Sequence, residues 1–200
     1  MCLAGPTSAW QAVDGQMPVS LPNGQTVLRP PSGWMCESGR ARIDLTRDGA
    51  LLNLITVSLR PHHRAFEKPD RIDSTADTLP AALADLYVLE FQQQSGIRDV
   101  KVLAIDSTTL AGVPAFRAQL TFRIDESLGG ALYEKVAIGA ATEYGVLLAD
   151  FAAPRLNFFP RSLPQFEAML ATIELLPQRR GASGISHACA AYPGEREADS

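Results

Sequence analysis

Residues 116–124 carry the most regular pattern in this chain, an unbroken alternation of apolar and polar side chains over Phe-Arg-Ala-Gln-Leu-Thr-Phe-Arg-Ile. Successive side chains on a β-strand point to opposite faces of the sheet, so this pattern predicts a strand with one face on a hydrophobic core. Its other face is predicted to meet water or a thin cover. Further strand-like runs and a helix follow, so the stretch constrains the chain to a fold built around a sheet.

The composition is that of an ordinary globular domain, with 46% hydrophobic and 20% charged residues among 200. The formal net charge is −4 and the isoelectric point is about 5.4, which argues against a nucleic-acid partner. No apolar run approaches the roughly 20 residues that a membrane-spanning helix needs. The pattern along the chain predicts a flexible lead-in over residues 1–25, one domain over 26–176 and a disordered tail over 177–200.

A β-hairpin is predicted around the pair Asp48-Gly49. Residues 42–46 alternate between apolar and polar side chains, and residues 51–59 form a longer run that is apolar on both faces in places. An Asp-Gly pair between two such runs is a strong turn signal, because the turn needs positive φ angles that glycine adopts at low cost. The second run is therefore predicted to be a central strand covered on both sides.

Two amphipathic helices are also predicted. The first begins near Thr78, has Pro80 in its first turn, and carries an apolar stripe at four-residue spacing. The stripe consists of Leu79, Leu83, Tyr87 and Phe91. The second helix is predicted to begin at a capping box, in which the side chains of Ser162 and Gln165 satisfy free backbone N–H groups.

Further strands are predicted over residues 100–103, 109–110, 132–138 and 144–151. The resulting order is a hairpin, a helix, four or five antiparallel strands and a closing helix. Such an order is typical of an α+β layered sandwich, an antiparallel sheet flanked by helices.

This order resembles the PsbP-like α/β/α sandwich, a fold shared by bacterial envelope lipoproteins of the DcrB and LpqN kinds. The likeness covers about residues 26–176. It is carried by Trp34, the Asp48-Gly49 hairpin, Leu110-Ala111-Gly112-Val113-Pro114-Ala115, Phe151-Ala152-Ala153-Pro154 and Phe166-Glu167-Ala168-Met169-Leu170. The resemblance implies an accessory or assembly factor, and it supplies no shared catalytic residues to assign here.

The three cysteines, Cys2, Cys36 and Cys189, are far apart in the sequence and odd in number. Their spacing predicts neither a disulfide framework nor a zinc cluster, so Cys36 is expected to be a small buried residue and Cys189 to play no part in the fold. A processed bacterial lipoprotein begins with a cysteine that carries the lipid, which makes Cys2 a candidate lipidation site. The alternative is an accidental cysteine near a terminus.

The sequence contains none of the standard catalytic or nucleotide-binding motifs. Adjacent side chains in an extended segment point to opposite sides, so His62 and His63 are not expected to share a metal ion. Asp150 lies in an apolar run, where a carboxylate must be paired or have a raised pKa. We expect it to pair with an arginine such as Arg155 rather than to act in catalysis. No cofactor is expected.

Two groups of residues are candidates for contact with a partner. Arg60, His62, His63 and Arg64 form a small basic patch after the central strand, which is either a solvated loop or a contact for an acidic partner or lipid headgroups. In the other group, Phe158 and Phe159 either cap the core or, beside Arg155, form an apolar anchor of the kind found at protein interfaces.

The sequence therefore predicts a non-enzymatic accessory protein that acts through surface contacts with a protein partner. If Cys2 is lipidated, the protein belongs to the periplasm or cell envelope, and a lipid anchor is its only expected contact with a membrane. The alternative is a cytoplasmic chaperone-like or neutralising module of a secretion or toxin gene cluster. A third hypothesis, an enzyme or small-ligand binder, would use Asp150 or the His62 loop.

Overall fold

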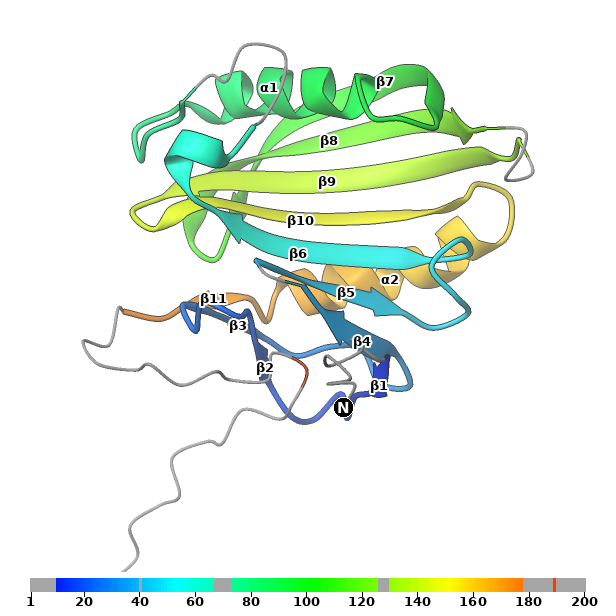
Figure 1. Ribbon diagram of the computed structural model, residues 1–200, viewed down its shortest axis with the longest axis horizontal. Coiled ribbons are helices and arrows are strands. Elements are labelled where there is room, and N and C mark those ends of the chain that lie inside the picture. Colours follow the sequence, from blue (N-terminus) through cyan, green and yellow to red (C-terminus); the bar gives the residue numbers. More distant parts are fainter. Residues whose placement is uncertain (1–9, 40, 67–72, 126–129, 178–188, 190–200) are drawn as a thin grey trace, which may run out of the picture.

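A computed structural model describes residues 10–39, 41–66, 73–125, 130–177 and 189. The largest part of the fold is one eight-stranded antiparallel sheet (Figure 1). In spatial order its strands are β1 (Gln11–Ala12), β4 (Met35–Ser38), β5 (Arg42–Thr46), β6 (Leu54–Arg60), β10 (Gly145–Pro154), β9 (Leu132–Thr142), β8 (Val113–Ile124) and β7 (Ile97–Leu110). The predicted α+β class is confirmed.

The alternating run that predicted a strand forms the last nine of the twelve residues of β8. Phe116, Ala118 and Leu120 pack under the first helix, whereas Arg117 reaches the second helix on the opposite face. The two separate runs predicted over 100–103 and 109–110 merge into the single strand β7, which lies at the edge of the sheet. An edge strand tolerates the polar residues between those runs because its side chains are exposed.

The predicted hairpin consists of β5 and β6, and Gly49 has a φ of +111° in its turn. β6 begins at Leu54 rather than at Leu51, because the buried side chain of Asn53 holds the turn. Its Oδ1 accepts hydrogen bonds from the backbone N–H groups of Arg47 (2.9 Å) and Asp48 (3.1 Å). β6 lies between β5 and β10, which confirms the prediction of a central strand.

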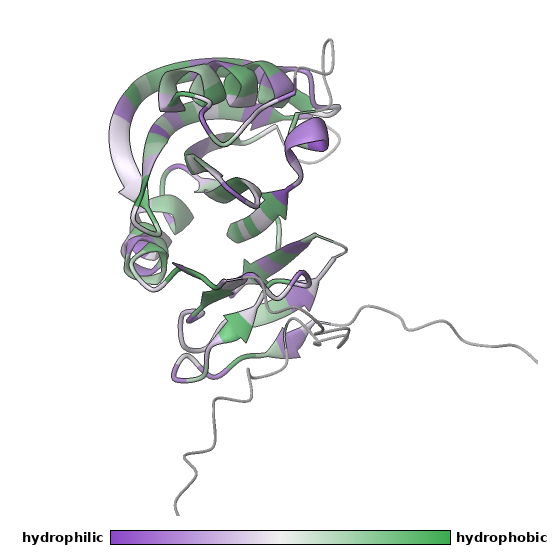
Figure 2. Ribbon diagram, turned by 90° about the vertical axis from the view of Figure 1, so that its left-hand side faces the viewer, coloured by the Kyte–Doolittle hydropathy of each residue, from purple (hydrophilic) through white to green (hydrophobic). Residues whose placement is uncertain are grey.

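The two helices cover opposite faces of the sheet. α1 (Pro80–Gln92) packs on β7, β8 and β9, and α2 (Phe158–Leu170) packs on β10. Along β10, Leu148 joins the core under α1, while the adjacent Leu147 joins the core under α2. The side view in Figure 2 shows how strongly the sheet curves between them. The arrangement is the predicted α/β/α sandwich.

α1 begins as predicted, with Pro80 at its first position, although Leu79 just before it is 70% exposed rather than part of the buried stripe. The predicted start of α2 is wrong. The helix begins at Phe158, so Ser162 is buried inside it, and the Ser162 hydroxyl has no hydrogen-bond partner among the described residues. Packing of Phe159 on Phe151 draws this segment into the first turn and overrides the capping signal.

Residues 10–25, which were expected to be part of a flexible lead-in, contribute to the core. Val13, Val19 and Leu21 are all buried. β2 (Val19–Ser20), β3 (Thr26–Leu28) and β11 (Glu174–Leu175) form a separate three-stranded sheet that lies at the opposite end of the fold from α1 (Figure 1). Residues 1–9 lie outside the described part of the chain, as does most of the predicted tail.

Candidate interaction site

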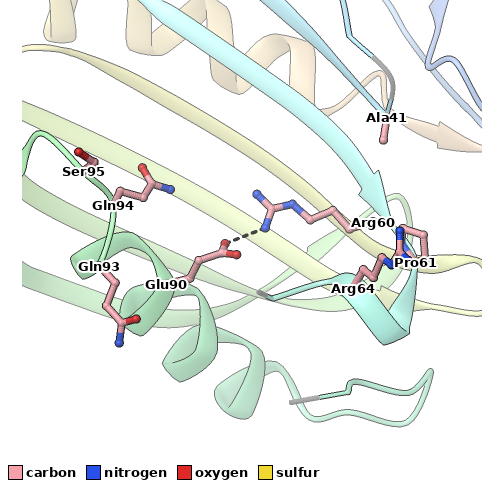
Figure 3. A pocket seen from close by; sticks show the side chains of 8 residues that line it. All are labelled: Ala41, Arg60, Pro61, Arg64, Glu90, Gln93, Gln94 and Ser95. Carbon is pink, nitrogen blue, oxygen red and sulfur yellow. Dashed lines mark hydrogen bonds and ion pairs between the residues drawn. The ribbon is translucent and has the colours of Figure 1, made fainter. Parts of the chain in front are cut away.

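A pocket of about 510 Å³ opens between the end of the central strand and the C-terminal end of α1 (Figure 3). Arg60 ends β6, and Arg64 lies in the short 3₁₀ helix η1 (His62–Arg64) that follows. The other lining residues are Ala41, Pro61, Glu90, Gln93, Gln94 and Ser95. Six of these eight residues are polar or charged, and two of them contribute guanidinium groups from the basic patch that the sequence predicted.

Arg60 is fixed in place by two hydrogen bonds. Its Nη1 donates to Oε2 of Glu90 (2.7 Å) and to the backbone carbonyl of Ala65 (2.9 Å). The Glu90 side chain is only 14% exposed, so this ion pair is partly shielded from water and ties the sheet to α1. The Arg60 side chain therefore lines the pocket in a fixed position.

Arg64 differs from Arg60 in being exposed. It forms no ion pair with any residue that the structure describes. Figure 3 shows it beside Pro61, on the other side of the pocket from Glu90. A planar guanidinium group that faces solvent at the rim of a polar pocket is suited to binding a carboxylate or phosphate group in a bidentate manner.

His62 connects this region to the hairpin between β9 and β10. Its Nε2 donates a hydrogen bond to the carbonyl of Thr142 (2.9 Å), and its Nδ1 lies 2.9 Å from the hydroxyl of Ser74. His63, the next residue, is exposed. The two histidine side chains therefore have different surroundings. No group of three metal-ligating side chains occurs among the described residues.

A buried charged pair lies next to the pocket, under α1. Asp150 on β10 forms an ion pair with Lys135 on β9, and both side chains are largely shielded from solvent. The Lys135 ammonium also lies 5.0 Å from the ring centre of Phe91. Burial, together with the nearby Asp150 carboxylate, raises the pKa of Tyr87 well above its usual value. Tyr87 therefore stays neutral and donates a hydrogen bond to Asp150.

The expected partner of Asp150 was thus wrong. Arg155 pairs instead with Glu134, at 3.6 Å, on the other face of the sheet. The error arises because Lys135 is distant in sequence and meets Asp150 only through the pairing of β9 with β10. The Asp150 carboxylate is paired and shielded from solvent. The geometry therefore does not favour an enzyme or a small-ligand binder that uses Asp150.

The second candidate group lies far from the pocket. Arg155 follows the end of β10, whereas Arg60 lies opposite Val146 at the start of that strand. Nine residues of extended chain separate these ends by about 30 Å, so the two predicted groups do not form one surface.

The two phenylalanines of this group are not an exposed anchor. Phe159 is 4% exposed and stacks on Phe151, with 5.3 Å between ring centres. Phe158 is half-buried beside the guanidinium of Arg161. The most exposed apolar residue at this end is Leu156, at 95%, and no sequence pattern pointed to it.

Sequence patterns did not identify three of the pocket residues, Glu90, Gln93 and Gln94. The spacing along α1 gave a signal for Glu90. Glu90 lies three residues after the buried Tyr87, at the border of the apolar stripe. A carboxylate at such a border can turn toward the sheet. Its pairing with Arg60 depends on where α1 lies over the sheet, which the sequence does not specify.

The expectations that the cysteines form no disulfide and that Cys189 plays no part in the fold were wrong. Cys36 on β4 and Cys189 form a disulfide bond, across a sequence separation of 153 residues. Cys36 is buried as expected, but Cys189 is buried with it and belongs to the same core. An odd number of cysteines still allows two of them to form one disulfide.

Cys2 lies outside the described residues. Among the described helices, none has the length and apolar character of a membrane span.

Neither a protein-family profile nor any curated protein matches the chain. Solved structures do match. The chain aligns with a cyanobacterial PsbP from Synechocystis at a TM-score of 0.54 and 8% identity, over 88% of this chain and 97% of that one. LpqN of Mycobacterium tuberculosis, described as involved in cell envelope biogenesis, aligns at a TM-score of 0.51 and 18% identity, over 80% and 90%. The protein has a PsbP-like fold.

The Ran-binding protein Mog1p of Saccharomyces cerevisiae has the same fold, with a TM-score of 0.54, 11% identity and coverage of 85% of this chain and 97% of that one. A longer protein from Bacteroides thetaiotaomicron aligns over 82% of this chain, and the chain spans 49% of its length. At these identities the likeness shows the fold alone.

Proposed function

We propose that this protein is a non-enzymatic accessory protein of the bacterial cell envelope, and that it binds an acidic segment of a protein partner at the pocket between β6 and α1. The observation that carries the proposal is the exposed guanidinium of Arg64 beside the fixed guanidinium of Arg60. The likeness to LpqN, described as involved in cell envelope biogenesis, supports the envelope location, and the likeness to a Ran-binding protein supports a role in protein contacts.

The pocket lining favours a peptide over a small aromatic or sugar ligand. Among the described residues it contains amide, hydroxyl, guanidinium and carboxylate groups but no aromatic ring on which a sugar or a heterocycle could stack. Gln93 and Gln94 can donate to and accept from a peptide backbone, and Arg64 can pair with an acidic side chain. These features support a partner segment that carries carboxylates.

The disulfide supports a location outside the cytoplasm. Structural disulfides persist in oxidising compartments such as the periplasm and the cell surface, and are rare in the cytosol. The bond between Cys36 and Cys189 therefore weighs against the alternative of a cytoplasmic chaperone-like or neutralising module. It also leaves Cys2 as the only cysteine in the sequence outside this bond, which is compatible with a lipid at that position.

The partner site is tested by affinity capture from native cells after cross-linking. Arg64→Glu should abolish recovery of the partner that the unaltered protein captures, because it places a carboxylate where an acidic segment binds. Arg47→Glu is the matched control, since Arg47 is also exposed but lies at the opposite end of β6. Equal recovery with both variants would refute the pocket as the binding site.

Location and anchoring are tested separately in the same cells. Free thiols are alkylated before lysis, and we expect Cys36 and Cys189 to react only after reduction. Metabolic labelling with a fatty acid should mark the protein and fail to mark Cys2→Ala. Reactive Cys36 and Cys189 in intact cells would exclude the envelope, whereas an unlabelled protein with the bond intact would exclude only the lipid.

A further inference from the structure

β7 forms an open edge of the eight-stranded sheet. Within the described residues it pairs only with β8, and its 14 residues are mostly exposed. Val102, Leu103 and Ile105 are between 43% and 50% exposed. An open edge with exposed apolar side chains is a template for another strand. The other edge, β1, has two residues and offers no such length.

The middle of β7 reads Lys101-Val102-Leu103-Ala104-Ile105-Asp106. This sequence is suited to pairing with a second copy of itself that runs in the opposite direction. When two copies run antiparallel, a lysine meets an aspartate at each end and an apolar residue meets an apolar residue between them. Neither Lys101 nor Asp106 forms an ion pair with any described residue, so both charges are available.

A β-bulge brings these residues to the correct faces. Val102 pairs with Leu120 and Ala104 with the adjacent Gln119, so Leu103 is an extra residue in β7. Without a bulge, Lys101 and Asp106 would point to opposite faces, because they are separated by an odd number of positions. With one extra residue between them, they point to the same face.

The pairing with β8 confirms these orientations. Ile105 lies opposite Ala118 and Val102 opposite Leu120, and both partners belong to the core under α1. Asp106 lies opposite Arg117, whose side chain reaches α2 on the other face. The apolar pair therefore belongs to one face of the sheet and the charged pair to the other.

We propose that two copies of this chain associate edge to edge through β7, as one continuous antiparallel sheet. Lys101 of each copy lies opposite Asp106 of the other, and Val102 lies opposite Ile105. Leu103 stays unpaired in each copy as the extra residue of the bulge, so the two Ala104 residues meet at the two-fold axis. This isologous contact is independent of the pocket near Arg64. A single strand pair buries less surface than a standard interface, so the dimer is weak and depends on concentration and salt.

Sedimentation velocity over a range of protein concentrations tests this dimer. The unaltered protein should shift from monomer to dimer as its concentration rises. Lys101→Asp should raise the dissociation constant about tenfold or more, because two attractive pairs become repulsive. Asp106→Lys should have a similar effect. The double variant Lys101→Asp/Asp106→Lys should associate like the unaltered protein, because the swap restores both pairs.

Arg47→Asp is the control for the change in net charge, and it should leave the dissociation constant unchanged. An equimolar mixture of the two single variants should form a heterodimer. A protein that stays monomeric at the highest concentration would refute the dimer. A dimer that is insensitive to Lys101→Asp, or is not restored by the double variant, would refute this edge and register.

Discussion

At the scale of single residues, the most consequential contact is the buried pair of Lys135 and Asp150. Lys135 is 8% exposed, and a lysine ammonium is costly to bury without a carboxylate partner. Sequence patterning identified Asp150 as a carboxylate that needed a partner but could not supply the partner's identity, because cross-strand neighbours depend on the register of the sheet.

We predict that Asp150→Asn lowers the free energy of unfolding by about 3 kcal/mol, because it leaves the Lys135 charge buried and unpaired. Urea denaturation followed by circular dichroism measures this loss. Asp85→Asn, on the exposed side of α1, is the control and should change stability by less than about 0.5 kcal/mol. A small effect at Asp150 would mean that the pair contributes little in solution.

Gly139 on β9 is a second residue that the packing requires. A Cβ at this position would lie 2.4 Å from Cε1 of Phe116 and 2.6 Å from Cδ2 of Leu148. We predict that Gly139→Ala destabilises the protein by about 1–3 kcal/mol through overpacking under α1. In Gly39→Ala the nearest atom is the flexible Arg42 side chain, at 3.3 Å, so that variant should unfold near the unaltered midpoint.

At the scale of elements, the local signals worked where tertiary contacts agreed with them. The alternation over residues 116–124 and the Asp48-Gly49 turn produced the expected strand and hairpin. The capping signal at Ser162 failed, because burial of Phe159 against Phe151 favours an earlier start for α2. Burial of a phenylalanine ring contributes more free energy than one N-cap hydrogen bond.

His62 holds one element against another. It fixes η1 to the β9–β10 turn through Thr142, so we predict that His62→Ala increases the hydrogen-exchange rates of residues 60–66. The expected loss of stability is about 1 kcal/mol. His63→Ala, which removes an exposed neighbour, should leave exchange unchanged. Equal exchange in the two variants would show that the His62 contacts do not stabilise this segment.

At the scale of the whole molecule, the disulfide connects β4 with Cys189 across 153 of the 200 residues. Closing a loop of 153 residues restricts the unfolded state strongly, so we predict that reduction lowers stability by about 2–5 kcal/mol. Urea denaturation with and without a reducing agent measures the difference. The double variant Cys36→Ser/Cys189→Ser should be insensitive to the reducing agent, and a similar sensitivity in that variant would contradict the prediction.

Local sequence patterns were enough to predict the class of fold, the central hairpin and the position of the first helix. These depend on alternation, turn residues and the helical stripe, all of which act over a few neighbouring residues. It also located Arg60 and Arg64, although it did not show that they line a pocket with Glu90 from α1.

Contacts between residues that are distant in the sequence became known from the folded chain alone. The pairings of Asp150 with Lys135, Cys36 with Cys189 and Arg60 with Glu90 depend on strand register and helix placement. These are set by the packing of the whole core, in which many weak contacts act together. No local pattern carries that information, so the pocket and the open edge became visible only in the folded chain.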